Sequence, residues 1–282
     1  MDKVDKNVNA LPPVLAELVQ RFDGELSLCV SDLQGEMLFC HEARQVFKAA
    51  SLIKLPILSC ALKTVETGAL SLQDRLPLAA QDQVPGAGVL HEMETGLALT
   101  VKDLLTLMII VSDNTATNVL IERLGRDTIN RHIQQIGLKD TFLVGKLQMP
   151  PELQNELQRT GQRSTTSAAD MNLWLLKLWQ GQLLNPEHTA LALGILKKQQ
   201  DRLVIARRLP RNSDGELMFE VASKSGEIQY HRHDVGIVFA EKPYAVSLLS
   251  RGSKDLREHP DHILTLSLAE VSERIFYLMQ AL

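Results

Sequence analysis

The sequence predicts an α+β fold: an antiparallel five-stranded sheet with the terminal helices packed on it, plus an all-helical subdomain. Two short alternating runs near the N-terminus, at 25–32 and 36–40, predict a hairpin. Three further strands are expected near the C-terminus, and the chain between these two regions has mostly helical patterns. Because strands occur at both ends of the chain, we expect all five to share one sheet.

The first elements are a helix and the hairpin. Apolar residues recur at i, i+3, i+4 and i+7 over 11–22, which predicts a helix that ends at Asp23-Gly24. Residues 25–32 then alternate between apolar and polar, and Gln34-Gly35 offers a turn before the second strand at 36–40.

The middle of the chain is predicted to be helical. A helix is expected over 51–67, and Thr100 with Asp103 forms a capping box that opens another through Met108. Further helices are expected at 115–124, 127–136, 168–179 and 187–199, several with a glycine just past the end. The loop over 142–166 is long enough to need a functional reason, so it is a candidate wall of a site.

The last elements are strands at 217–222, 233–240 and 245–250 and an amphipathic helix over 263–279. We therefore expect one domain over residues 11–282. Its α/β part comprises about 11–50 and 212–282 and its helical part about 51–211, while residues 1–10 are expected to be disordered or extended.

Composition excludes several classes of function. Thirty basic and thirty-four acidic residues give a net charge of −4, so no broad cationic surface invites nucleic acid or an anionic membrane. The polar N-terminus shows no signal peptide and no apolar run is long enough for a membrane span. The sequence does not decide the compartment of the protein. The given chain predicts a cytoplasmic location, whereas a removed signal peptide would imply a periplasmic or extracellular one. Oligomeric state is also open.

Neither a disulfide framework nor a metal site is expected. Cys29, Cys40 and Cys60 are odd in number and lack paired CxxC spacing, so they are expected to be small apolar core residues. His231 and His233 would share one face of a strand, as metal ligands could, but we expect them to be solvent-facing.

Three short motifs carry the chemistry. Ser51-Leu52-Ile53-Lys54 places a hydroxyl and an amine one helical turn apart, which suits a nucleophile and its base when apolar neighbours bury the amine. A chain of this length also contains about one S-x-x-K by chance, in which case the lysine is simply solvated on a helix surface.

The other two motifs have similar alternatives. Ser112-Asp113-Asn114 follows an apolar helix and is either a capping turn or a set of groups aimed into a cleft. Lys224-Ser225-Gly226 follows the strand at 217–222 and offers a cation, a hydroxyl and a residue without Cβ to a ligand at a sheet edge. The alternative is an ordinary edge strand with a lysine that discourages aggregation.

In this order, the three motifs resemble those of penicillin-recognising serine hydrolases, and of class A β-lactamases in particular. The stretches KAASLIKLPIL and VSDNTATNVLIERLG strengthen the resemblance, as does the order of elements from about Leu11 onward. The resemblance implies a hydrolase that needs no metal and no organic cofactor.

The resemblance also implies roles for individual residues. Ser51 would be the acylated nucleophile, Lys54 its base, and Ser112 the group that passes a proton to the leaving nitrogen. Asn114 would hold the amide side chain of the substrate, while Lys224 would help to keep Lys54 neutral.

The remaining roles concern the third motif. Lys224 and Ser225 would bind the substrate carboxylate next to Gly226. The backbone N–H groups of Ser51 and Glu227 would form the oxyanion hole.

One departure concerns the second half of the reaction. In class A enzymes a Glu followed by Pro-Glu-Leu-Asn activates the water that frees the acyl-enzyme. Here Pro150 stands where that Glu is expected and Gln154 where the Asn is expected. Glu152 or Glu156 would take the role if the loop winds differently.

The leading hypothesis is therefore a serine β-lactamase that opens β-lactam rings through an ester on Ser51. One alternative is a D-alanyl peptidase or esterase on the same scaffold that β-lactams acylate but that deacylates slowly, acting on a peptidoglycan-like amide or ester. Another is a β-lactam-sensing domain that reports acylation to a partner.

Overall fold

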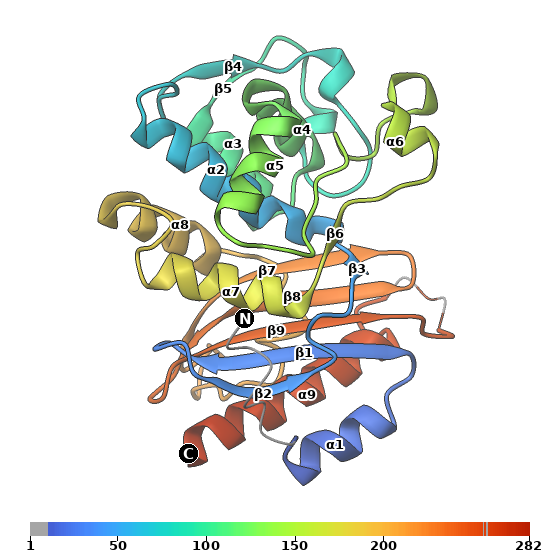
Figure 1. Ribbon diagram of the computed structural model, residues 1–282, viewed down its shortest axis with the longest axis vertical. Helices are drawn as coiled ribbons and strands as arrows, with labels where there is room; N and C mark the ends of the chain where they lie inside the picture. The colour runs from blue at the N-terminus through green and yellow to red at the C-terminus, as the bar shows by residue number, and fades with distance from the viewer. Residues whose placement is uncertain (1–10, 256, 258) are drawn as a thin grey trace.

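The structure is a computed structural model that describes residues 11–255, 257 and 259–282. The expectation for residues 1–10 lies outside them. Five strands form one antiparallel sheet in the order β2-β1-β9-β8-β7 (Figure 1). They are β1 Glu25–Asp32, β2 Met37–His41, β7 Glu220–Ile228, β8 His231–Phe239 and β9 Tyr244–Arg251. The predicted α+β fold with its five-stranded sheet is confirmed.

Helices cover both faces of this sheet because its strands alternate side chains between two apolar clusters. Leu26, Leu28 and Val30 of β1 pack on one face with α1 (Pro13–Gln20) and α9 (Ile263–Ala281). The intervening Cys29 belongs to the cluster on the opposite face. There α7 (Ala168–Trp179) and α8 (Pro186–Lys197) lie between the sheet and the remaining helices (Figure 1).

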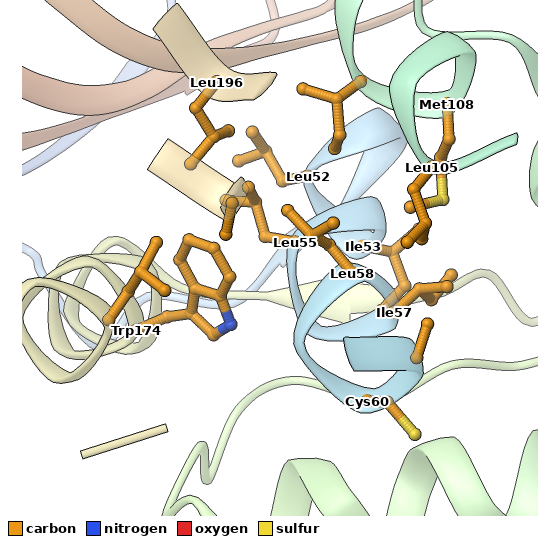
Figure 2. Packing of buried hydrophobic residues seen from close by; sticks show 14 of the residues in the cluster. Leu52, Ile53, Leu55, Ile57, Leu58, Cys60, Leu105, Met108, Trp174 and Leu196 are labelled. Carbon is orange, nitrogen blue, oxygen red and sulfur yellow. The ribbon is translucent and has the colours of Figure 1, made fainter. Parts of the chain in front are cut away.

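The helix that carries the first motif is the centre of the larger cluster. An η2 turn, Ala50–Ile53, leads directly into α2, Lys54–Glu66, and every side chain from Lys54 to Leu62 is buried. Figure 2 shows α2 between Trp174 and Leu196 on one side and Leu105 and Met108 on the other. A helix enclosed in this way has little freedom to move, so it holds its first residues in a fixed position.

The other helices of this layer are α3 Val101–Ile110, α4 Asn114–Leu124 and α5 Arg126–Gln135. The predicted capping box is present: Asp103 N donates to Thr100 Oγ1 and Thr100 N donates to the Asp103 carboxylate, each over 3.1 Å. The proposed division of the chain near residues 50 and 212 stays a prediction.

Several short elements escaped sequence reasoning because two or three residues show no periodicity. They are β3 Phe47–Lys48, paired with β6 Thr165–Thr166, and β4 Arg75–Pro77, paired with β5 Ala98–Thr100. The remaining single turns are η3 Ala80–Asp82, η4 Leu90–Glu92, η5 Pro151–Leu153 and α6 Glu156–Arg159. The last two lie inside the long loop predicted over 142–166.

Two details of the C-terminal strands differ from expectation. Lys224, Ser225 and Gly226 lie within β7 rather than after it, because the apolar pattern ends at Ala222 while the strand continues through buried polar residues. His231 and His233 were expected to face solvent, which is wrong, since both are buried in β8. Among the described residues, no helix combines the length and apolarity needed to cross a bilayer.

Candidate active site

Ser51 lies in the η2 turn at the mouth of a cleft of about 580 Å³. The preceding residue, Ala50, has a φ of 44°, a left-handed conformation that costs a non-glycine residue about 1 kcal/mol or more. This conformation turns the chain sharply from β3 into the helix. The surrounding core enforces the turn, which leaves Ser51 at the cleft and the next residues inside the protein.

Hydrogen bonds connect Lys54 to Ser51 through Ser112. Lys54 Nζ lies 3.1 Å from Ser112 Oγ, and Ser112 Oγ donates to Ser51 Oγ over 2.8 Å. Lys54 Nζ also donates to the Ser112 carbonyl over 2.5 Å and to Asn114 Oδ1 over 2.9 Å. The structure therefore brings the first two motifs together, although they are far apart in the chain.

Ser112 can meet Lys54 with two atoms because its backbone is left-handed, with a φ of 56°. The turn lies between the end of α3 and the start of α4 and directs both the carbonyl and the hydroxyl of Ser112 toward the amine. The cost of this conformation is offset by the hydrogen bonds it allows. Such strained residues gather at functional sites, which fits the position of Ser112 beside Ser51.

The two lysines of the motifs are fully buried, with 0% exposure each. Burial lowers the pKa of Lys54 well below its usual range, and the positive charge of Lys224 lowers it further against the opposing charge of Asp113. Burial also lowers the pKa of Lys224 to about 8, against the opposing charges of Asp201 and Asp234. Burial and the charge of Lys224 act in the same direction, so the site shifts Lys54 toward its neutral form, which is the form a base requires.

Asp113 anchors the opposite wall of the cleft. Its Oδ1 caps α4 by accepting from Ala116 N, while Oδ2 accepts from the backbone N–H groups of Val89 and Leu90 over 2.6 and 2.9 Å. The wall passes so close to the second motif that a Cβ on Gly86 would lie 2.9 Å from Asn114 Nδ2. This segment of the wall therefore requires a residue without a side chain.

Strand β7 passes directly behind Ser51. A Cβ on Gly226 would lie 3.3 Å from Ser51 N, so the absence of a side chain allows this close approach. Glu227 lies on the cleft, and its carboxylate pairs with Arg232 on β8. Lys224 Nζ donates to the Ser225 carbonyl over 2.7 Å.

A group of charges lies behind the third motif. Asp234 is directly opposite Ser225 in the β7–β8 register, and burial and the like charge of Asp201 raise its pKa to about 7. Arg232 binds Asp201 through two contacts of 3.0 and 2.9 Å. These carboxyl groups favour the charged form of Lys224 in a buried position.

The long loop forms the third wall of the cleft, and its polar lining there comprises several glutamines with Lys146, Arg163 and Ser164. Gln154 and Gln158 line the cleft, and Gln158 Nε2 donates to the Lys146 carbonyl over 2.7 Å. Glu152 and Glu156 are exposed and are not among the lining residues. The structure does not bring either glutamate to Ser51.

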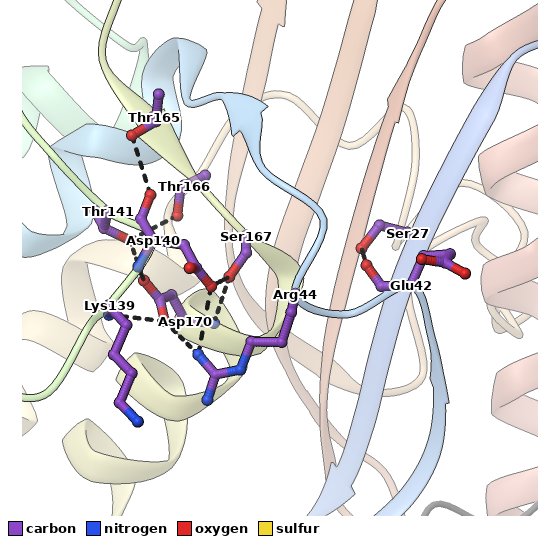
Figure 3. A network of polar contacts seen from close by, with 10 residues as sticks. All are labelled: Ser27, Glu42, Arg44, Lys139, Asp140, Thr141, Thr165, Thr166, Ser167 and Asp170. Carbon is purple, nitrogen blue, oxygen red and sulfur yellow. Dashed lines mark hydrogen bonds and ion pairs between the residues drawn. The ribbon is translucent and has the colours of Figure 1, made fainter. Parts of the chain in front are cut away.

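A polar network holds the end of this loop against the sheet (Figure 3). The buried carboxylate of Asp170 accepts from Thr141 Oγ1 and from the backbone of Lys139 and Asp140, and Arg44 pairs with it over 3.2 Å. Thr141 Oγ1 also lies 2.9 Å from Thr166 Oγ1 in β6. The loop is therefore fixed at its base while its middle faces the cleft.

The buried histidines of β8 lie within hydrogen-bond distance of backbone carbonyls. His233 Nε2 lies 2.9 Å from the Lys48 carbonyl, and its Nδ1 accepts from Ser250 N over 3.2 Å. Both ring nitrogens are thus engaged with the backbone, and the ring fastens β3 to the sheet just before Ser51. Within residues 11–255, 257 and 259–282, no group of three or more suitable side chains could hold a metal ion.

Sequence reasoning missed the wall formed by residues 84–90, as well as Asp234 and Arg232. The pattern Pro85-Gly86-Ala87-Gly88 was a signal that could have found the wall, because two glycines so close together often mark a tight backbone approach. Arg232 and Asp234 lie in a strand-like segment where no local pattern reveals their neighbours Asp201 and Lys224.

This fold and the serine–lysine arrangement at its centre define a class A β-lactamase-like serine hydrolase. The chain belongs to the β-lactamase enzyme family, whose sequence model matches residues 10–276.

Individual relatives agree with this assignment. A β-lactamase from Rhodobacter capsulatus is 28% identical over 235 residues, which cover 83% of this chain and 77% of the relative. The crystal structure of a β-lactamase from Sphaerobacter thermophilus superposes with a TM-score of 0.83 at 28% identity, covering 95% of this chain and 97% of that one. An acyl-enzyme complex of a PBP-A variant with penicillin G gives a TM-score of 0.80 at 27% identity, covering 95% of each chain.

Proposed function

We propose that the protein opens β-lactam rings by forming an ester on Ser51. The observation that carries this proposal is the hydrogen-bonded connection from Lys54 through Ser112 to Ser51, with the amine buried and its pKa depressed. A serine hydroxyl becomes a strong nucleophile only when a neutral base can take its proton. A charged lysine in the same place has no free electron pair for this purpose.

In the proposed acylation, Ser51 Oγ attacks the lactam carbonyl carbon while its proton moves through Ser112 Oγ to Lys54 Nζ. The backbone N–H groups of Ser51 and Glu227 stabilise the negative oxygen that forms. The carbon–nitrogen bond of the lactam then breaks, and the proton returns through Ser112 to the leaving nitrogen. The product of this step is an ester on Ser51 with an opened ring.

The remaining motif residues bind the substrate in this proposal. Lys224 and Ser225 hold the substrate carboxylate, a pairing of cation and hydroxyl that charge-assisted hydrogen bonds favour. Asn114, which lines the cleft, holds the amide side chain. Gly226 contributes to this site by letting β7 pass close to the backbone of Ser51.

A second candidate is an acyl-enzyme that releases its product slowly, as in a D-alanyl peptidase or a β-lactam sensor. The favouring observation is the chemistry of the loop wall, where Gln154 and Gln158 face the cleft and the two nearby glutamates do not. An amide cannot take a proton from water at neutral pH, whereas a carboxylate can.

Intact-protein mass, followed over time after mixing with a penicillin, tests both candidates. A transient adduct with many product molecules per protein supports a β-lactamase, and a persistent one-to-one adduct supports slow release. Ser51→Ala should remove the adduct, whereas Ser71→Ala, which changes an exposed serine outside the cleft, should keep it. An adduct on Ser51→Ala would refute the proposed nucleophile.

A further inference from the structure

Two cysteines face each other across the N-terminal hairpin. Cys29 of β1 and Cys40 of β2 are directly opposite in the antiparallel register, and their Sγ atoms lie 2.8 Å apart. All three cysteines are free thiols in the structure. The third, Cys60, lies within α2 and hydrogen-bonds neither of the other two in the described structure.

The position of this pair suits a covalent bond. Directly opposite residues of antiparallel strands have Cα atoms about 4.5–5.5 Å apart, which lies within the span that a disulfide bridges. Side chains of opposite residues also point to the same face of the sheet. The short distance between the two sulfurs shows that both thiols already adopt rotamers directed at each other.

Of the two thiols, only Cys40 is accessible to solvent. Cys29 is fully buried under α7, and its carbonyl accepts a hydrogen bond from Asn172 Nδ2 over 3.2 Å. Cys40 is partly exposed on β2, an edge strand of the sheet, which pairs with β1 only. The rigid strand thus holds the inner sulfur, while the edge strand can supply the small movement that bond formation needs.

The pKa values of the two thiols shift in opposite directions. Burial raises the pKa of Cys29 well above its usual value, and the hydrogen bond to Cys40 adds to this. The same hydrogen bond lowers the pKa of Cys40, so the Cys40 thiolate forms more readily. The accessible sulfur is therefore also the better nucleophile.

We propose that Cys29 and Cys40 are an oxidative modification site that forms a disulfide between β1 and β2. The oxidant is a small or protein disulfide. The Cys40 thiolate attacks one sulfur of the oxidant, whose own S–S bond breaks and releases a first thiolate. Cys40 is then joined to the other half of the oxidant in a mixed disulfide, and the Cys29 thiol gives its proton to the first thiolate. The Cys29 sulfur attacks Cys40 Sγ and displaces the second thiolate of the oxidant, which solvent protonates. The two cysteines are oxidised by two electrons and the oxidant becomes two thiols.

The bond would fasten the edge of the sheet. It closes a short loop that contains the turn of the hairpin, which lowers the entropy of the unfolded chain. It also resists peeling of β2, whose pairing with β1 already shifts register between Val30 and Ser31. The site lies apart from the catalytic cleft, so this inference does not depend on the proposed function.

The test is to treat the full chain with oxidised glutathione at mildly alkaline pH and then to count thiols under denaturing conditions. We expect the three thiols of the reduced protein to fall to one, with the mass lowered by two hydrogen atoms. Cleavage after glutamate, which cuts at Glu36 between the cysteines, should yield peptide 26–36 joined to peptide 37–42. The melting temperature should rise by about 5 °C and return after reduction.

Matched variants separate this bond from other outcomes. Cys40→Ser should lose the mass change and the thermal shift, while Cys60→Ala should keep both. Three remaining thiols, a stable glutathione adduct on Cys40, or a bond that includes Cys60 would each overturn the proposal. Penicillin labelling of the same samples shows whether the site on Ser51 is intact, so a failure of either proposal is recognised separately.

Discussion

A Cβ atom on Gly88 would stand 2.3 Å from the carboxyl carbon of Asp113. The backbone at Gly88 therefore rests directly on the side chain that caps α4 and holds the wall over 84–90. This contact links the wall of the cleft to the turn that carries Ser112. One carboxylate consequently contacts both the wall over 84–90 and the turn that presents the Ser112 hydroxyl.

Gly88→Ala should disturb this contact. The added methyl group must displace Asp113, so we expect a loss of about 2 kcal/mol in the free energy of unfolding and slower acylation by penicillin. Gly96→Ala is the matched control, because Gly96 also has a positive φ but nothing lies within 4 Å of its Cβ position. Equal effects of the two variants on acylation would show that backbone strain alone is responsible.

Lys224→Met should change how acylation depends on pH. The charge of Lys224 helps to lower the pKa of Lys54, so its removal raises that pKa. Lys54 then loses its proton only at higher pH. In a plot of the maximal acylation rate against pH, the rise on the acid side should therefore shift by about one unit to higher pH. Lys197→Met, on the surface of α8, should leave this rise in place. An unchanged rise in Lys224→Met contradicts the assignment of Lys54 as the base.

Buried His233 should make the protein less stable in mild acid. Burial lowers its pKa to about 4 in the folded protein, whereas the unfolded chain takes up this proton near pH 6.5. Between these values the unfolded state binds more protons, so the free energy of unfolding falls as the pH falls, by about 3 kcal/mol for this group.

Denaturant titrations across this window measure the effect. His233→Gln should reduce the slope of stability against pH, and the exposed His259→Gln should not. His132, whose pKa burial also lowers to about 4, should account for a further part of the slope. A His233→Gln variant with the full slope would show that the ring is protonated in the folded state.

Pro150→Glu should accelerate release of the acyl group if the loop lacks a base. Pro150 aligns with the glutamate that the class A resemblance implies for this loop, so a rate increase of about tenfold or more is expected. Glu152→Gln and Glu156→Gln should each leave release unchanged, because both side chains are exposed outside the cleft lining. Slow release in either variant would assign the base to that glutamate. The rate is measured as the decay of the penicillin adduct by intact mass.

The fold could be predicted because its strands and helices follow apolar periodicity almost everywhere. The prediction failed where function places polar groups inside the protein. Lys224 and Ser225 interrupt the apolar pattern of β7, so the strand seemed to end before them. His233 is polar and buried for a similar reason, since its partners are backbone atoms of β3 and β9 that no local pattern reveals.

The motifs located the site, but they could not define its walls. Ser51 and Lys54 are one turn apart, so their proximity follows from helix geometry alone. The contact of Gly88 with Asp113 and the outward position of Glu152 depend on how loops fold over the cleft. Loop paths are set by tertiary contacts such as the network around Asp170, which joins parts of the chain that are distant in sequence.

The pairing of β1 with β9 has a consequence for biosynthesis. The two strands match from Glu25 opposite Arg251 to Asp32 opposite Tyr244, so β1 finds one of its two neighbours only in a segment that is translated much later. Throughout synthesis the nascent hairpin carries an open edge while the helical segments emerge from the ribosome. The sheet is completed only once β9 is available, and the long chain segment between the two strands makes this pairing a slow, non-local step of folding.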